Sequence, residues 1–303
     1  ITCTSTAKQR PEGGWLWKIS GNGLSHPSYL FGTYHGTYDI LYQYTDSIPE
    51  LHQASNACSQ FAGESETTSK PTPAQVGAAI KLPKDTTYAD LLNKEDFHFL
   101  DSIVRQSLKS PLNKVYIKPN FLALILGEIE KGKKLVDTGY SQSRIDSMKS
   151  QVMDIALEKK AKEKGLTIVG LEGIFDAFVS EKSNLKKEAD ELISDLREDD
   201  EISPLSFVNT LSDVYRTQNM KSLIDFEVKV DSIFRTSPKL TEIGKRIRED
   251  LLKRRNLNWM NKIPELMKAQ PTFIAVGVRH LPGKDGLIAL LLEKGYQVEP
   301  IGL

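Results

Sequence analysis

Residues 271–303, PTFIAVGVRHLPGKDGLIALLLEKGYQVEPIGL, decide the fold of this chain. Residues 272–276 form an apolar, partly β-branched run between Pro271 and Gly277, and this predicts a buried strand because the run is too short for a helix. His280 follows the end of that strand. Open α/β sheets bind ligands at the carboxyl ends of their strands, so His280 is a candidate site residue.

The remainder of this stretch predicts how the chain returns to the sheet. Residues 281–286 have the composition of a turn. Residues 287–294 are apolar in a helical pattern, Gly295 is the expected C-cap, and residues 296–301 alternate as a strand. The unit is therefore strand, loop, helix, strand.

The same arrangement occurs near the N-terminus. Residues 28–31 predict a strand that leads into Gly32 and His35, as the later strand leads into Gly277 and His280. A glycine there lets the backbone turn sharply or approach a ligand closely just before the imidazole. Two Gly-x-x-His loops in a chain with five histidines indicate a functional site.

The predicted elements define the fold class. Further strands are expected at residues 15–19, 57–64 and 166–171, and helices at residues 48–56, 88–108, 121–129 and 144–164 and across most of residues 174–268. Gly21-Asn22-Gly23 predicts a hairpin turn between the first two strands, and Ser237-Pro238 a helix boundary. We therefore expect an α/β fold with a mixed, mostly parallel sheet, built from both ends of the chain and covered by a large helical middle section.

The domain organisation follows from the same pattern. Residues 1–14 are interpreted as a disordered or linker-like N-terminus. Residues 15–303 are interpreted as a single α/β domain with helical insertions at about 71–165 and 173–269. The acidic run at residues 198–201 is expected to be a loop.

Composition excludes several classes of function. The chain is 39% hydrophobic and 26% charged, as in ordinary soluble proteins, and its 40 basic residues balance 40 acidic ones, which argues against nucleic acid as a partner. No apolar run approaches the roughly eighteen residues of a spanning helix. Cys3 and Cys58 are too few for a disulfide framework or a thiolate metal site.

The first residues bear on localisation. The chain begins with Ile1 rather than Met, and its Ser/Thr/Lys-rich start resembles the linker of an exported mature protein. We expect an exported protein, periplasmic or tethered to a membrane through a segment that precedes this sequence; a trimmed chain is the alternative. Ile1 and Thr2 ahead of Cys3 argue against a lipid anchor on that cysteine.

Several motifs together carry a family resemblance. They are YLFGTYH at residues 29–35, AGE at 62–64, GLE at 170–172, Arg255-Asn256 with Trp259, and AVGVRHLPG at 275–283 with Gly286. In this combination the chain resembles the TraB/GumN family, which includes the Tiki metalloproteases and is distantly related to erythromycin esterases and the ChaN haem-binding lipoproteins. The resemblance runs from about residue 15 to residue 301.

The resemblance implies an erythromycin esterase/ChaN-like fold in which both Gly-x-x-His loops and two glutamates share one cleft. The positions that match the family's expected metal ligands are His35, Glu64, Glu172 and His280. Arg255 and Asn256 match its polar pair, and these two with Glu64 are the expected catalytic residues. Ser59 and Gln60 make the strand before Glu64 less apolar than is usual in the family.

The chemistry of these side chains agrees with a hydrolase. Two imidazoles and two carboxylates suit Zn²⁺, Mn²⁺, Co²⁺ or Fe²⁺. Such an ion lowers the pKa of its water from roughly 16 to about 7 and polarises a carbonyl, as amide or ester hydrolysis requires. One glutamate could instead be a general base, and Arg255 could stabilise a developing oxyanion.

We therefore expect a metal-dependent hydrolase, most simply a peptidase with a peptide or protein substrate. Two alternatives stay open: a non-catalytic protein that sequesters a peptide signal or a haem-like ligand, and a metal-independent esterase with His35 as general base. Single residues also have simpler roles, since Glu172 suits a helix N-terminus and Arg255 a helix surface.

One geometric expectation follows for the site. If His35 and His280 bind one ion, their strands must be neighbours with their carboxyl ends at one edge of the sheet, because metal–nitrogen bonds are about 2.0–2.1 Å long. We therefore expect His35, Glu64, Glu172 and His280 in a single cleft with Arg255 at its wall.

Overall fold

The computed structural model of the chain describes residues 13–34, 49–66, 71–137, 139–143, 145, 152–173, 175, 184–197 and 211–302. The chain divides into two compact units. Unit 1 comprises Ile1–Thr68, Ser150–Gly173 and Ile202–Leu303, and unit 2 comprises Ser69–Lys149 and Ile174–Glu201. All strands of the sheet belong to unit 1, whereas the described elements of unit 2 are helical.

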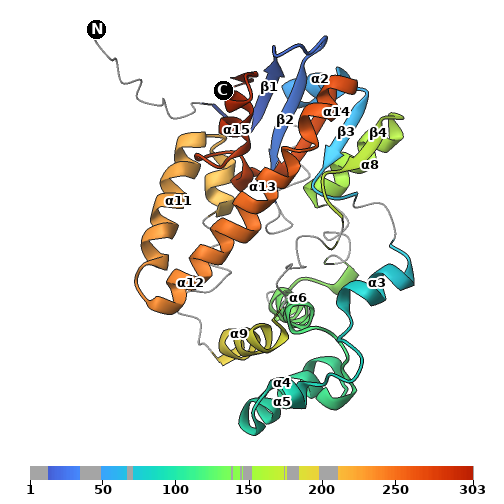
Figure 1. Cartoon of the computed structure of the whole chain (residues 1–303), viewed down its shortest axis with the longest axis vertical. Coiled ribbons are helices and arrows are strands. Elements are labelled where there is room, and N and C mark those ends of the chain that lie inside the picture. The colour runs from blue at the N-terminus through green and yellow to red at the C-terminus, as the bar shows by residue number, and fades with distance from the viewer. Residues whose placement is uncertain are drawn as a thin grey trace. The chain divides into compact units, whose positions relative to one another are not determined.

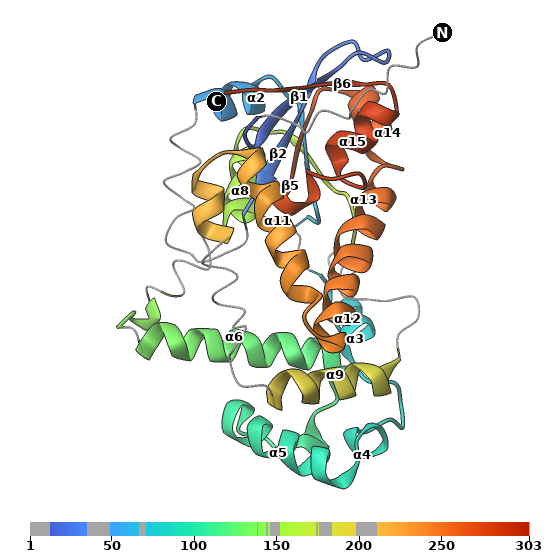
Figure 2. The ribbon, with the colours of Figure 1, turned by 90° about the vertical axis from the view of Figure 1, so that its left-hand side faces the viewer.

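A six-stranded sheet organises unit 1, with the strand order β4-β3-β5-β2-β1-β6 (Figures 1 and 2). The strands are β1 Leu16–Ser20, β2 Ser28–Thr33, β3 Gln60–Gly63, β4 Thr167–Gly170, β5 Thr272–Gly277 and β6 Gln297–Pro300. Strands β4, β3, β5 and β2 are parallel to one another, whereas β1 is antiparallel to both β2 and β6. The expected α/β fold with a mixed, mostly parallel sheet is confirmed.

The strands that precede the two Gly-x-x-His histidines are neighbours. β2 pairs in parallel with β5, and Thr33 lies opposite Gly277. On the other side of β5 lie β3 and then β4, with Gly63 opposite Gly170. Four parallel strands therefore end at the same edge of the sheet, which we call the carboxyl edge. His35 itself lies outside the described residues.

The helices of unit 1 are α2 Pro49–Asn56, α8 Met153–Glu163, α11 Met220–Phe234, α12 Pro238–Arg246, α13 Arg254–Trp259, α14 Ile263–Ala269 and α15 Leu287–Glu293. A π-helical segment, η2 Ile247–Lys253, joins α12 to α13, and a 3-10 segment, η3 Val278–His280, follows β5. Unit 2 contains α3 Pro73–Ile80, α4 Tyr88–Leu91, α5 Lys94–Leu108, η1 Leu112–Lys114, α6 Pro119–Asp137 and α9 Leu185–Arg197.

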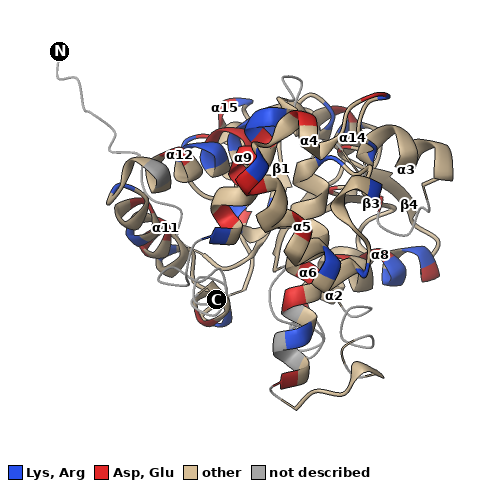
Figure 3. Cartoon of the chain, turned by 90° about the horizontal axis from the view of Figure 1, so that it is seen from below, with Lys and Arg blue, Asp and Glu red and all other residues tan. Residues whose placement is uncertain are grey.

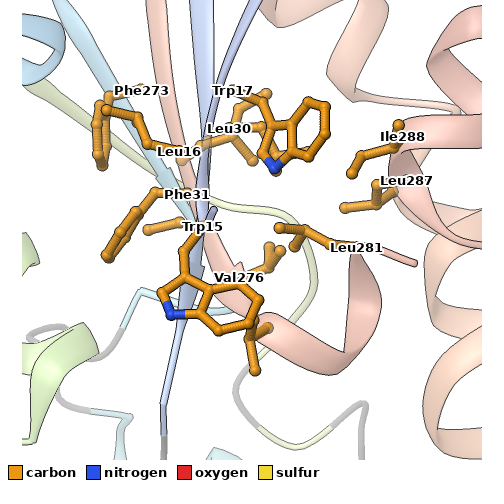
Figure 4. Packing of buried hydrophobic residues seen from close by; sticks show 14 of the residues in the cluster. Trp15, Leu16, Trp17, Leu30, Phe31, Phe273, Val276, Leu281, Leu287 and Ile288 are labelled. Atoms are coloured by element: carbon orange, nitrogen blue, oxygen red, sulfur yellow. The ribbon is translucent and has the colours of Figure 1, made fainter. Parts of the chain in front are cut away.

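The hydrophobic core of unit 1 lies on both faces of the sheet. Figure 4 shows Trp17 and Leu30 on the side of α15, whereas Phe31 and Phe273 lie on the other side of the strands. On that second side Phe273 stacks on Phe61, with ring centroids 6.2 Å apart, near the apolar side chains of α2 and α8. Alternation along β2 explains this division, since successive side chains of a strand point to opposite faces.

Turn chemistry accounts for the hairpin that opens the sheet. Gly21, Asn22 and Gly23 adopt left-handed φ values of +76°, +46° and +79° between β1 and β2, as the sequence predicted. Gly32 is required for a different reason. A Cβ atom there would lie 2.8 Å from Cγ2 of Val278, so its absence lets β2 approach η3 closely.

Several helix predictions need correction. The helix expected at residues 88–108 is divided into α4 and α5, because Asn93 leaves the helical conformation and its side chain accepts a hydrogen bond from the backbone of Asp96 as an N-cap. α6 is longer than the expected helix at residues 121–129. Of the helix expected at residues 144–164, α8 is described from residue 153, and residues 146–151 lie outside the described ones. The acidic run at residues 198–201 also lies outside the described residues.

Two further findings concern the helices. α8 and α11–α14, which the sequence placed in the helical middle, belong to unit 1. Acidic and basic residues are interspersed along α11 in Figure 3. On this helix Lys221 and Asp225 form an ion pair of 2.6 Å. No helix in the described ranges combines the length and apolar character that crossing a membrane demands.

Candidate active site

Charged and polar side chains from three adjacent strands and one helix meet at the carboxyl edge, all within unit 1. Glu64 follows β3, Glu172 follows β4, and His280 ends the η3 segment after β5. The backbone N–H of Glu172 donates to the carbonyl of Glu64 at 2.8 Å, which ties the first two loops together. Arg255 and Asn256 reach this edge from α13.

Arg255 lies between the two glutamates. Its Nη2 donates to Oε2 of Glu64 and to Oε1 of Glu172, both at 2.5 Å, and its Nε donates to Oε1 of Glu172 at 3.0 Å. Burial alone would lower the pKa of Arg255, but the charge of Glu64 and the hydrogen bonds and charge of Glu172 outweigh it and raise that pKa. The guanidinium is therefore a permanent cation held between two carboxylates.

Glu172 is bound on both of its oxygens. In addition to Arg255, the indole Nε1 of Trp259 donates to Oε2 of Glu172 at 3.0 Å. The guanidinium of Arg255 lies over the Trp259 ring, 4.7 Å from its centroid. Since Trp259 is fully buried, Glu172 fixes both side chains in place.

Glu64 connects the guanidinium to the loop that carries His280. Its Oε1 accepts a hydrogen bond of 2.7 Å from the backbone N–H of Gly277, the glycine of the second Gly-x-x-His motif. The same oxygen lies 3.8 Å from Nε2 of His280. Glu64 is thus held by β5 and directed toward the imidazole.

Asn256 determines which nitrogen of His280 carries the proton. Its Nδ2 donates to the carbonyl oxygens of Asp285 and His280, at 2.8 and 3.2 Å, and carbonyls can only accept. Its Oδ1 must therefore face Nδ1 of His280, 2.7 Å away, and accept a proton from it. With its proton on Nδ1, a neutral His280 presents the lone pair of Nε2 to Arg255 Nη1 at 3.3 Å and to the site.

Three site residues come from one helix, which begins directly after a π-helical segment. Arg255, Asn256 and Trp259 all lie on α13, which begins directly after η2. A π-helical turn holds more residues than an α-helical turn, so the side chains after it point in new directions, and such segments are frequent at functional sites. The amphipathic pattern of the sequence gave no signal of this segment.

The sequence matches the model of a known protein family. The model of the TraB/PrgY/gumN family covers residues 15–300, nearly the whole chain. This protein belongs to the TraB/PrgY/gumN family. The resemblance inferred from the motifs is thereby confirmed, whereas no curated protein and no solved structure matches the chain significantly. The chemistry of this TraB/PrgY/gumN protein must therefore be argued from its own site.

Two side chains of this TraB/PrgY/gumN protein fit a divalent metal ion. Ligand atoms of one ion lie about 3–3.5 Å apart when each bond is about 2.0–2.2 Å long. Oε1 of Glu64 and Nε2 of His280 are 3.8 Å apart, but the Nε2 lone pair faces Nη1 of Arg255 at 3.3 Å, so an ion bound there would displace that contact. Among the described residues no three His, Cys, Asp or Glu side chains form a group suited to a metal. A complete site thus requires a further donor, and His35 lies outside the described residues.

The end of β2, just before His35, is held by residues that the sequence did not single out. Thr33 Oγ1 donates to Oδ1 of Asp154 on α8 at 2.8 Å. The hydroxyl of Tyr215 donates to the carbonyl of Gly32 at 2.7 Å, and its ring stacks on that of Tyr34 with centroids 5.2 Å apart. These contacts join segments far apart in the sequence, so no local pattern could have indicated them.

Proposed function

We propose that this protein is a metal-dependent hydrolase, most simply a peptidase that acts on peptide bonds. The observation that carries the proposal is the pair of donors at the carboxyl edge: the Nε2 lone pair of His280, set by Asn256, stands 3.8 Å from Oε1 of Glu64 beside a buried cation. In the proposal Glu64, His280 and His35 hold a divalent ion. Zn²⁺, Mn²⁺, Co²⁺ and Fe²⁺ all suit imidazole and carboxylate ligands.

When bound, such an ion would lower the pKa of a water molecule and polarise the carbonyl of a substrate. The side chains of the chain supply the rest. Arg255 places a fixed positive charge next to His280, where it would stabilise negative charge that develops on a carbonyl oxygen. In other hydrolases, removal of one hydrogen-bond donor that is already in place for the oxyanion raises the activation free energy by about 2.7–4 kcal/mol.

Glu172 has a positioning role in this proposal rather than the expected role as a metal ligand. Both of its oxygens accept hydrogen bonds, from Arg255 and from Trp259. Loss of these bonds would release Arg255 from its position. Glu172 therefore acts through Arg255 and does not itself contact the substrate. Glu64 keeps its expected role as a metal ligand, because its Oε1, which accepts a hydrogen bond from the N–H of Gly277, lies 3.8 Å from Nε2 of His280.

Arg255 also favours a second candidate function. The chain itself already supplies a buried cation between Glu64 and Glu172, and a cation of this kind can replace a metal ion in stabilising an oxyanion. A metal-independent esterase would then use a histidine as general base. This candidate predicts activity on esters that survives chelation.

The test is hydrolysis of a pool of random-sequence peptides and of simple aryl esters, measured with chelator and after each divalent ion is restored. The proposal predicts cleavage of peptides that chelation abolishes, that one ion restores, and that His280→Ala and Arg255→Met lose. Asn258→Ala is the matched control, because Asn258 is exposed on the same helix. Ester cleavage that resists chelation would establish the second candidate instead.

Peptide or haem binding without any turnover would favour a sequestering protein, the remaining alternative. A Soret band on addition of haem to the purified protein distinguishes haem from a peptide ligand. Export, periplasmic or through a membrane tether, also stays a proposal, and fractionation of cells that produce the full-length protein tests it.

A further inference from the structure

One edge of the sheet is less protected than the other against pairing with a further strand. β4 is the outermost strand beside β3 (Figure 1), and its sequence, TIVG, contains no charge and no proline. The opposite outermost strand, β6, has the same length but contains Glu299 and Pro300. Proteins commonly place charges and prolines on exposed edges to prevent further pairing. β4 has neither device.

Hydrogen-bonding groups of β4 point away from the sheet. The N–H groups of Thr167 and Leu171 donate to the carbonyls of Ser59 and Gly63, at 3.1 and 2.9 Å. In a parallel pair the residues of a strand alternate in direction, so the N–H and C=O groups of Ile168 point away from β3. Those of Gly170 do the same. Within the part of the chain that the structure describes, no other segment forms a hydrogen bond with them.

β4 leads directly into the candidate active site. Glu172 comes two residues after Gly170 and binds Arg255. A strand advances about 3.3 Å per residue, so an extended chain beside β4 passes within about two residues of this position. Ile168 and Val169 are half-buried and add apolar surface next to the edge.

We propose that an extended peptide docks by adding a strand to β4. Its backbone pairs with the outward N–H and C=O groups of Ile168 and Gly170, and its continuation reaches Glu64, Arg255 and His280. Strand addition takes its affinity from main-chain hydrogen bonds, so the bound peptides share an extended backbone rather than one sequence. Strand addition would be the way in which the proposed peptidase binds its substrate. Cleavage of the docked peptide rests on the proposed function, whereas its binding does not.

A second copy of the chain is a weaker candidate for this edge. β4 has four residues, and specific protein–protein interfaces bury about 800 Å² on each partner. A short peptide needs only the few backbone bonds that β4 offers.

Hydrogen exchange on the wild-type protein tests the docking without any variant. The protein is incubated with an excess of random-sequence peptides, and exchange of the amides of Ile168 and Gly170 is followed by mass spectrometry with fragmentation or by NMR. We expect slower exchange at these two amides and no change at the amides of β6. A pool with N-methylated backbones should give no protection.

A pair of variants isolates the backbone group. Ile168→Pro removes an outward N–H that the sheet does not use, whereas Ile168→Val keeps the N–H and the branched side chain. We expect Ile168→Pro to weaken peptide binding about three- to tenfold, the value of one net hydrogen bond, and Ile168→Val to leave it unchanged. Urea unfolding of both variants establishes that the sheet is intact.

Three results would overturn the proposal: unchanged exchange at Ile168 and Gly170, equal binding by the two variants, or concentration-dependent protection of β4 in a dimer without peptide. Protection by peptides that are never cleaved would support docking and at the same time reject the proposed peptidase. The two proposals therefore fail separately.

Discussion

Substitution of Asn256 should disturb both the stability of the protein and the proton position on His280. Asn256 is 2% exposed and makes three hydrogen bonds, of 2.7, 2.8 and 3.2 Å, to His280 and Asp285. Asn256→Leu keeps much of the side-chain volume but removes all three bonds. It also removes the Asn256 partner from Nδ1 of His280 and from the carbonyls of His280 and Asp285.

The expected loss in the free energy of unfolding is about 2–4 kcal/mol, from about 0.5–1.5 kcal/mol for each of the three bonds. Asn258→Leu is the matched control on the same helix, and since Asn258 is exposed we expect a change within about 0.5 kcal/mol. Urea unfolding followed by tryptophan fluorescence and far-UV circular dichroism measures both values.

The imidazole gives a second readout that a purely structural role would not change. Long-range ¹H–¹⁵N NMR should show the proton of neutral wild-type His280 on Nδ1, and a mixture of both tautomers in Asn256→Leu. Peptide hydrolysis, if present, should fall with the Nδ1-protonated fraction. A loss below about 0.5 kcal/mol, or the same tautomer in both proteins, would refute the assigned role of Asn256.

Three further outcomes follow from the structure. Glu172→Gln should lower stability by about 1–3 kcal/mol and reduce kcat more than it raises KM, because Arg255 loses a charged partner; equal kinetics in the variant would argue against a positioning role. Burial raises the pKa of the Cys58 thiol from 9.0 to about 12, so its stabilising contribution is complete below pH 9 and is lost as the pH rises toward 12. In a Cys3→Ser background we therefore expect iodoacetamide to modify Cys58 at pH 9 only after unfolding, and fast labelling of the native protein would contradict its burial. Tyr215→Phe should cost about 1 kcal/mol in a urea titration, since it removes the hydroxyl that donates to the carbonyl of Gly32 and contacts the sulfur of Met153; no change would mean that this hydroxyl adds nothing to stability.

The sequence predicted the frame of the site because that frame depends on local patterns. The strands before Glu64, Glu172 and His280 are visible as short apolar runs, and their parallel arrangement places the three residues at one edge. The hairpin at Gly21 and the helix start at Ser237 also follow from local turn and cap chemistry. Such features need only a few neighbouring residues.

The contacts within the site could not be predicted, since they join distant segments. Arg255 reaches Glu64 across 191 positions of the sequence and Glu172 across 83. The π-helical segment that precedes it leaves no periodic signal, and Trp259, interpreted from sequence as a packing residue, is also a hydrogen-bond donor to Glu172. The break between α4 and α5 was not predicted either. The apolar pattern of residues 88–108 continues through Asn93, but the N-cap at Asn93 divides the helix there.

Metal content measured by mass spectrometry decides whether Glu64, His280 and His35 hold an ion. Wild-type protein, His280→Ala, His35→Ala and the exposed control Asn258→Ala would be purified and dialysed side by side against the same metal-free buffer. We expect about one divalent transition-metal ion per chain in the wild type and the control, and a loss of that ion from both histidine variants, since each removes one of only three proposed ligands. Wild-type protein that binds no such ion even after each metal is supplied, or histidine variants that keep it in full, would contradict the account.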